Sequence, residues 1–399
     1  MQPLTIEPNP ASSTMPAVLA LAFRPFFLLA GLWAVLAIAL WLGQLSGWWS
    51  GQLLLPATLW HAHEMLFGFG ALVAAGFLLT AAQNWTGVPG LKGGKLALLC
   101  LIWLLARLTP FVAPSQDIWL LIALQSLWWL GVIAALGRQL WLAKSRNNYQ
   151  FLPLLLAMAG LNAAVLWLSQ SQHWALASHL SHSMILLFCL LMGIVGGRVI
   201  PFFTARATQT EQPRTVRLDR WVLVSTLAAS GHFIVSAWWP ALPSPGGLLL
   251  LAGLLHLWRL GCWFTPGLLQ QPLLWSLHGS YLALASGLLL MGFSLLTGWL
   301  NFKDMLHLIA VGAMAAMMLA MMARVSLGHT GRSLAARPVM AWSFATLLLC
   351  GFCRSLATAL GAPHLLWQLS AALWLAAFLI FTWVYWPILT SPRLDGRAG

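Results

Sequence analysis

Acidic side chains are scarce in this sequence. It has only 7 Asp and Glu among 399 residues, and charged residues of both signs together make up 7%, against about 25% in soluble globular domains. The chain therefore lacks the polar surface that a water-soluble fold needs. Its 5 cysteines all lie in apolar stretches and do not form a disulfide framework. The CxxC of Cys350 and Cys353 is interpreted as helix packing.

Apolar residues, in contrast, make up 60% of the sequence. Runs of about 20 of them, each long enough to cross a hydrocarbon core of roughly 30 Å, recur from end to end. We expect an all-α polytopic membrane protein, a bundle of about twelve transmembrane helices that forms one integral-membrane domain over residues 1–399. The expected spans are 22–42, 58–81, 95–114, 118–137, 150–169, 177–201, 220–239, 247–265, 272–296, 304–325, 339–360 and 364–386. Glu7 and the lack of a basic region near the start argue against a cleavable signal peptide.

Basic side chains give the chain a formal net charge of +13, which could suggest binding to nucleic acid. Their distribution argues otherwise. Along the expected spans, all but three of the 20 Lys and Arg fall on one side; the exceptions are Lys303, in a link on the other side, and Arg107 and Arg354, inside spans. This asymmetry follows the positive-inside rule and predicts that both termini are cytoplasmic. We therefore expect membrane lipid, and not nucleic acid, as the partner of the basic residues.

Histidines gather at one depth of the expected bundle. The outer ends of four different spans hold His61, His63, His179, His182, His232 and His307. Ionisable groups inside a bilayer are costly and usually mark a function, and neutral imidazole is a common metal ligand. Although a single histidine near an interface more often forms a local hydrogen bond, six at one depth predict a metal or heme site on the outer side.

The segment HAHEM supplies two of these histidines and a carboxylate. Residues two apart on a helix point about 200° from each other, so either His61 bends inward or His61 and His63 have different partners. His63 is the preferred ligand, because its face continues through small residues that let a helix or a flat macrocycle approach. Glu64 is expected to orient an imidazole, to transfer a proton as a catalytic group, or to cap the helix. Glu64 or a heme propionate is the expected partner of Arg354.

A smaller polar group is expected toward the cytoplasm. His278 lies early in the ninth span, and His329 follows the tenth. We expect these two histidines to form a second, inner cofactor site. Arg324 and Arg332 lie near it in the sequence, and a guanidinium suits the carboxylates of a heme. His256 lies at a similar depth.

Five segments carry a resemblance to a known family. They are FRPFFLLAGL (23–32), WHAHEMLFGFGALVAAGFLLTAAQNWTG (60–87), GGRVIPFFT (196–204), LHGSYLALASGLLL (277–290) and LGHTGR (327–332). In these segments the chain resembles the NnrS family. The resemblance implies a twelve-span protein of the bacterial inner membrane that contains heme, of the b type, and copper, and that acts on nitric oxide in denitrification or in protection against nitrosative stress. The motif residues are His61, His63, Glu64, His278, His307 and His329.

The leading hypothesis is therefore a heme and copper membrane protein that binds or reduces nitric oxide. If it is an enzyme, it is an oxidoreductase of the nitric oxide reductase type that takes electrons from quinol or another donor. The expected ligands are His63 and His307 on the outer side, supported by His61 and His182, and His278 and His329 on the inner side.

Two alternatives stay open. A sensor or scavenger would bind nitric oxide without turnover, and the sequence does not separate it from an enzyme. A secondary transporter is less favoured, because such proteins usually rely on carboxylates near the midplane. Glu64 is the only carboxylate well inside an expected span, and it lies toward the outer surface.

Overall fold

The structure is a computed structural model that describes residues 15–49, 54–112, 118–239 and 241–396. Glu7 and Arg397, a basic residue of the expected cytoplasmic side, lie outside this part of the chain. The described residues form helices and contain no strand, which confirms the all-α prediction. Long helices occupy all twelve expected ranges in the described residues, within a few residues at most ends.

Two of these long helices each consist of three consecutive segments. Helix 57–86 is α2 (Ala57–His63), η2 (Glu64–Gly70) and α3 (Ala71–Thr86), and helix 302–329 is α11 (Phe302–His307), η5 (Leu308–Ala315) and α12 (Ala316–His329). The other ten are α1 (Phe23–Leu45), α4 (Gly94–Val112), α5 (Ile118–Leu142), α6 (Phe151–Gln170), α7 (Trp174–Thr208), α8 (Val216–Ser236), α9 (Gly246–Cys262), α10 (Pro272–Thr297), α13 (Pro338–Ser355) and α14 (Pro363–Thr390). Short 3₁₀ turns occupy Ala17–Leu19, Arg146–Asn148 and Pro266–Gln270.

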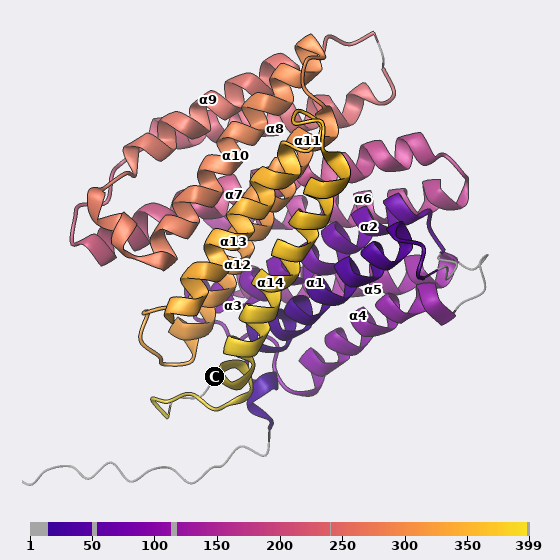
Figure 1. The fold of residues 1–399 in the computed structure, drawn as a ribbon. Helices are drawn as coiled ribbons and strands as arrows, with labels where there is room; N and C mark the ends of the chain where they lie inside the picture. Colours follow the sequence, from indigo (N-terminus) through magenta and orange to yellow (C-terminus); the bar gives the residue numbers. More distant parts are fainter. Residues whose placement is uncertain (1–14, 50–53, 113–117, 240, 397–399) are drawn as a thin grey trace, which may run out of the picture.

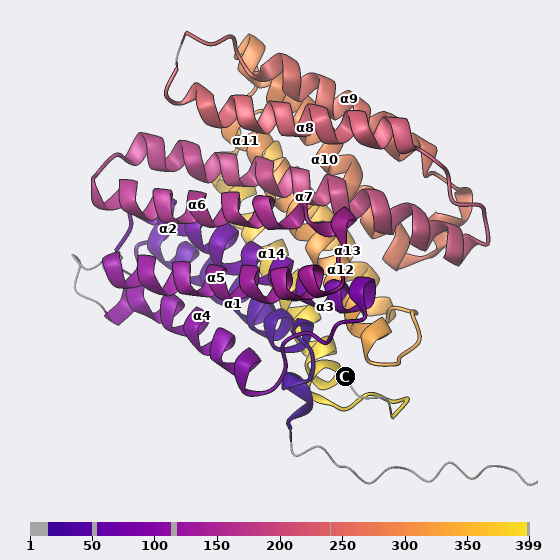
Figure 2. The ribbon, with the colours of Figure 1, turned by 180° about the vertical axis from the view of Figure 1, so that it is seen from behind.

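Ten of the long helices in the described residues are apolar and long enough to cross a membrane. The two others are α8, which begins with three charged residues within five positions, and α9, which is apolar but has only 17 residues. Figures 1 and 2 show these two helices side by side on one flank of the bundle, with α4 and α5 toward the opposite flank. The protein is thus a multi-pass membrane protein, while a count of twelve spans and the cytoplasmic termini stay predictions.

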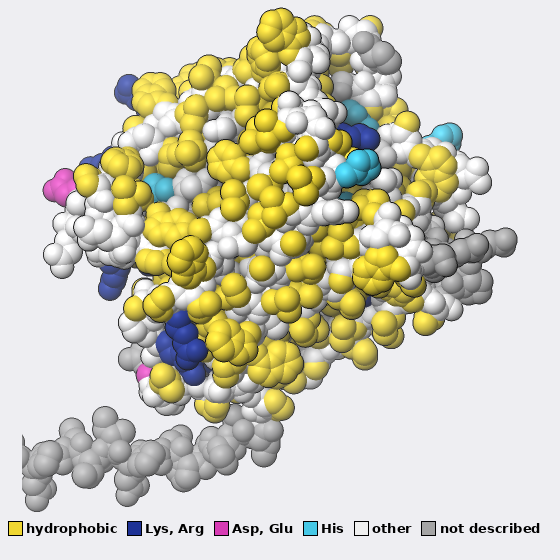
Figure 3. Space-filling view, viewed as in Figure 1, with side chains coloured by type: hydrophobic (Ala, Val, Ile, Leu, Met, Phe, Trp, Pro, Cys, Tyr) yellow, Lys and Arg dark blue, Asp and Glu magenta, His cyan; other side chains and the backbone are white. Residues whose placement is uncertain are grey.

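The helices alternate in direction, so the bundle has two distinct ends. We call the basic end the one where α1, α4, α6, α8, α10 and α13 begin, and the histidine end the opposite one. At the basic end Arg24 Nη1 donates to the carbonyls of Leu389 (3.1 Å) and Ser391 (2.7 Å), which joins the start of α1 to the end of α14. Both described chain ends lie there (Figure 1). The face of the bundle shown in Figure 3 is mainly apolar, as lipid contact requires.

Two π-helical segments interrupt the α-helical hydrogen-bond pattern. Segment η2 begins directly after His63, and η5 begins directly after His307. Helix α7 contacts both segments. A π-helical turn is rare and is frequently found at functional sites. Both interruptions therefore indicate a candidate functional site at the histidine end. Neither was expected from the sequence.

Candidate functional site

Glu64 is the centre of a buried polar network at the histidine end. Its side chain is 1% exposed and accepts three hydrogen bonds from three helices. Trp33 Nε1 on α1 donates to Oε2 at 2.9 Å, and Arg107 Nη1 on α4 donates to the same oxygen at 2.5 Å. His63 Nδ1 lies 3.0 Å from Oε1. A carboxylate inside a bilayer stays ionised only with such partners. The ion pair with Arg107 joins the start of helix 57–86 to α4, and the hydrogen bond from Trp33 joins it to α1.

His63 is bound to protein through both ring nitrogens. Nδ1 donates to the Glu64 carboxylate, which can only accept, and Nε2 lies 3.1 Å from Oδ1 of Asn162 on α6. Because a neutral imidazole accepts at Nε2, the Asn162 amide must turn over so that its NH₂, buried without a partner as placed, donates to this nitrogen. His63 is therefore a member of the network and has no nitrogen free for a metal in this conformation. The structure supports Glu64 as a positioning group for His63.

The expected partner of Arg354 is corrected by the structure. Glu64 pairs with Arg107, whereas Arg354 Nη1 donates to Asp304 Oδ1 at 2.6 Å. The second oxygen of Asp304 accepts from the backbone N–H of Thr358 at 3.0 Å. Asp304 is only 3% exposed, so Glu64 is not the only buried carboxylate. Its burial was not predicted, because Asp304 stands at the first residue of an expected span, where a charge usually faces water.

Three other histidines lie together beside this second ion pair. His61 and His182 are both close enough to His307 to interact with it electrostatically, and Arg354 interacts with His307 and His61 in the same way. His307 Nδ1 is 2.6 Å from the Lys303 carbonyl one turn earlier, which fixes the ring and leaves Nε2 for another partner. These imidazoles come from three elements, α2, α7 and α11, and form what we call the histidine cluster: His61, His182 and His307.

The two histidines of HAHEM, His61 and His63, have different partners. This is one of the two outcomes expected for residues that point about 200° apart on a helix. His61 stacks on Trp41, with ring centroids 4.7 Å apart and an interplanar angle of 16°, and its Nδ1 is buried without a hydrogen bond. Because His63 is fully bonded, the geometry favours His61 and His307 over His63 as ligands. His182 packs edge-on against Phe302 at 5.5 Å.

The six outer histidines share a depth but not a site. His179 Nε2 lies 2.8 Å from the Phe233 carbonyl, and its ring stacks on Phe233. His232 Nε2 lies 2.7 Å from the Pro243 carbonyl. Both satisfy local backbone acceptors. In the described residues no three His, Cys, Asp or Glu side chains converge at metal-binding distance, so the histidine cluster as it stands does not present three ligands to one ion.

At the basic end, His278 has one ring nitrogen held by the backbone and one without a hydrogen bond. Its Nδ1 lies 3.0 Å from the Leu274 carbonyl, one turn earlier on α10, and its Nε2 is buried without a hydrogen bond of ordinary geometry. The ring also lies near the backbone of Trp263. A ligating imidazole usually has its second nitrogen fixed in this way. Heme needs one such histidine from the protein, so His278 and His307 fit it, whereas a copper centre with three protein ligands does not fit the described residues.

His329 and His278 have different neighbours. The His329 ring packs against Phe23 at 5.7 Å, and its Nε2 is 3.4 Å from the side-chain amide of Asn84. Of the two arginines expected beside them, Arg324 lies over the Phe203 ring at 3.7 Å and has a buried Nε without a partner. Arg332 instead lines a separate cavity with Arg337. The structure therefore does not bring the four predicted residues of the inner site together.

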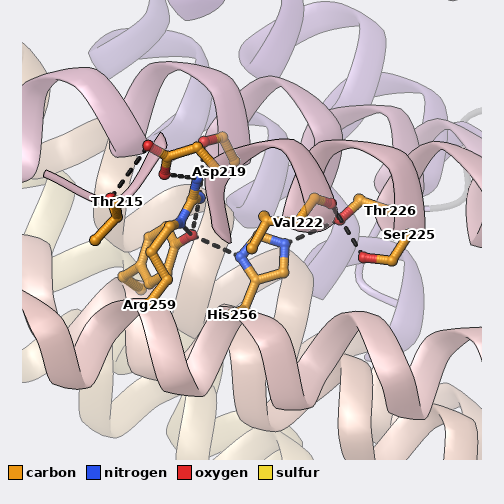
Figure 4. A network of polar contacts seen from close by, with 9 residues as sticks. Thr215, Asp219, Val222, Ser225, Thr226, His256 and Arg259 are labelled. Atoms are coloured by element: carbon orange, nitrogen blue, oxygen red, sulfur yellow. Dashed lines mark hydrogen bonds and ion pairs between the residues drawn. The ribbon is translucent and has the colours of Figure 1, made fainter. Parts of the chain in front are cut away.

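A second buried network lies near His278 and was not expected (Figure 4). Tyr281, one turn beyond His278 on α10, accepts hydrogen bonds from Arg259 Nε (2.8 Å) and from its Nη2, and lies 2.6 Å from His256 Nδ1. His256 Nε2 is 3.0 Å from the Thr226 hydroxyl, and Arg259 Nη1 reaches Asp219 at 3.2 Å. This network joins α8, α9 and α10 and borders a cavity of about 210 Å³.

Sequence reasoning also missed Asn162 and Trp33, which complete the Glu64 network. The signal for Asn162 was available, because an amide in the middle of an apolar span needs a partner. Trp33 carried no such signal, because it is one of 25 tryptophans in the chain.

Long membrane-crossing helices, buried ion pairs between them and imidazoles grouped at one end define a multi-pass membrane protein with intramembrane polar sites. The chain belongs to the NnrS family: the family profile described as NnrS protein matches residues 17–393, nearly the whole chain. Membership is consistent with a membrane protein related to nitric oxide. No curated protein matches the chain.

Proposed function

We propose that this protein of the bacterial inner membrane is a heme protein that binds nitric oxide, either to reduce it or to sequester it. The observation that supports this most is the histidine cluster beside two π-helical segments. His61 and His307 both interact with Arg354, no ion pair found among the described residues joins a cluster histidine to a carboxylate, and the Nδ1 of His307 is fixed on a carbonyl so that Nε2 faces away. A group of imidazoles held in this way is arranged to bind something that prefers nitrogen ligands.

His307 at the histidine end and His278 at the basic end are the two residues that would hold heme iron. When bound, heme supplies an iron atom that can take nitric oxide as a ligand. The chain holds each imidazole in one orientation through the carbonyl one turn earlier. Arg324, whose Nε has no partner, is the proposed contact for a heme carboxylate. Copper is kept as a proposed second metal, without a step, because the described residues do not gather three ligands for it.

The apolar sides of the bundle explain how the ligand arrives. Nitric oxide is small and uncharged and dissolves in lipid, so it can reach a centre between helices without a polar channel. Reduction would in addition need protons and an electron donor, for which quinol stays a proposal. Glu64 is not arranged as a proton donor here, since Arg107, Trp33 and His63 occupy its two oxygens. This favours a second candidate, binding without turnover in a sensor or scavenger.

The test is the absorbance spectrum and metal content of purified wild type and of His278→Ala, His307→Ala, His61→Ala and His329→Ala. We expect a Soret band and iron in the wild type, loss of heme in His278→Ala or His307→Ala, and little change in His329→Ala. His173→Ala and His364→Ala are matched controls, because both side chains are exposed. A wild type without a Soret band and without iron would overturn the proposal.

Anaerobic incubation with nitric oxide and a reductant separates the enzyme from the binder. Nitrous oxide that accumulates over many turnovers identifies an enzyme. Uptake that stops at one nitric oxide per heme identifies a sensor or scavenger.

A further inference from the structure

A second cavity lies at the basic end, at the other end of the bundle from the histidine cluster. It has a volume of about 340 Å³ and is bordered by the end of α12, the link that follows it and the end of α14. Its polar lining includes Arg332, Ser333 and Arg337, and its apolar lining includes Leu327, Val384 and Ile388. None of its described lining residues is a histidine. The cavity thus combines cationic donors with an apolar wall and no metal ligand of the kind proposed above.

Neither arginine of this cavity has an acidic partner among the residues that the structure describes. The ion pairs found among the described residues include neither Arg332 nor Arg337. The neighbouring Arg393 is neutralised by Asp395, with bonds of 2.8 and 2.6 Å that raise the pKa of Arg393. Arg332 makes one long contact, 3.4 Å, to the Thr330 carbonyl. Two guanidinium groups therefore stay available for an anion.

The cavity lies at the level where lipid headgroups are expected. Trp383 and Trp386, in the last two turns of α14, are 70% and 49% exposed. Tryptophan on the outside of a membrane protein is enriched at the membrane–water interface. Residues on the neighbouring faces of the same turns, Val384 and Ile388, form the apolar wall of the cavity. A ligand there meets charge and hydrocarbon together.

We propose that this cavity binds the phosphate of an anionic phospholipid, with Arg332 and Arg337 on its oxygens and an acyl chain along the apolar face of α14. A guanidinium donates two parallel hydrogen bonds to a phosphate, and basic pockets between membrane helices bind anionic headgroups. The apolar wall and the tryptophans favour a lipid over a soluble anion. In this role Arg332 binds a lipid phosphate and not, as expected from the sequence, a heme carboxylate. The proposal does not depend on the proposed function.

The test measures lipid retention and stability of the full chain in detergent. Wild type and Arg332→Gln/Arg337→Gln are titrated with phosphatidylglycerol or phosphatidylcholine, and bound lipid is counted by native mass spectrometry while unfolding temperature is recorded. Arg217→Gln/Arg220→Gln is the matched control, since it removes two exposed arginines from the same end at the start of α8. Glycerol phosphate, which lacks acyl chains, is the competitor.

We expect phosphatidylglycerol to stay bound to the wild type and the control and to raise their unfolding temperature more than phosphatidylcholine does. In the double variant its apparent affinity should fall about fivefold for each arginine lost. Equal retention in all three proteins would overturn the proposal. Displacement by glycerol phosphate as easily as by lipid would also overturn it and would identify a site for soluble phosphates.

Discussion

Helix 57–86 and helix 302–329 are built alike at the histidine end. Each has a carboxylate and a histidine in its first turns, each continues into a π-helical segment, and each pairs its carboxylate with an arginine from the next long helix. Glu64 pairs with Arg107 and Asp304 pairs with Arg354. The two differ in what the imidazole does. His63 is bound to Glu64 and Asn162, whereas His307 bonds only its own helix carbonyl through Nδ1.

Burial explains this difference. The Glu64–Arg107 pair is 1% exposed on both sides, and the Arg354 side chain is 15% exposed. A carboxylate that has no water nearby needs every donor it can reach. His63 therefore serves as a hydrogen-bond donor to Glu64. Asp304 is satisfied by Arg354 and a backbone N–H, which leaves His307 available. Two similar motifs thus divide into one that holds the bundle together and one that presents a ligand.

The largest expected effect is that of Arg107→Leu. It leaves Glu64 as a buried charge without its cation, and breaking such a pair costs about 3–5 kcal/mol. Thermal unfolding in detergent should show a large loss of stability and expression should fall. The double variant Glu64→Gln/Arg107→Leu removes both charges and should regain part of the loss. A single variant as stable as wild type would show that the pair does not support the fold.

His63→Phe should have the next largest effect on unfolding. It leaves the Asn162 amide and one carboxylate oxygen without partners in a buried place, at a cost of about 1–3 kcal/mol. If His63 is instead a metal ligand, the variant should lose metal while its cofactor-free stability stays unchanged. Unfolding of metal-depleted protein, measured beside metal content, decides between the two.

Asp304→Asn should destabilise less than Arg107→Leu. The amide keeps the size of the carboxylate, and Arg354 can turn toward water, so we expect a cost of about 1–2 kcal/mol. Asp219→Asn is a suitable control because that carboxylate is 39% exposed and should change stability less. A loss as large as that of Arg107→Leu would remove the proposed difference between the two helices.

His307→Phe should change stability least, by about 0.5 kcal/mol or less in cofactor-free protein, because its one hydrogen bond is to its own helix. The same variant should lower heme content. The informative result is the contrast with His63→Phe: equal losses of stability would show that both imidazoles belong to the scaffold.

The order of the helices could be predicted from the sequence, but the partners within the bundle could not. Apolar runs and polar links located the helical ranges, and alternation placed six histidines at one end. Arg354 was expected to have an acidic partner, and both it and Arg107 have one. Their identities depended on which helices are neighbours: α4 packs close enough for Arg107 to reach Glu64, and α13 for Arg354 to reach Asp304.

What the sequence determined by itself is the kind of molecule and the depth of its polar groups, because hydrocarbon thickness fixes how long an apolar run must be and the chain cannot hide its charges within it. Which imidazole is free was decided only by the tertiary structure. His61 and His63 differ by two positions, yet one stacks on Trp41 and the other is bonded on both sides. The rotation of the helix and its packing against its neighbours set that difference, and neither can be predicted from the residue pattern of one helix.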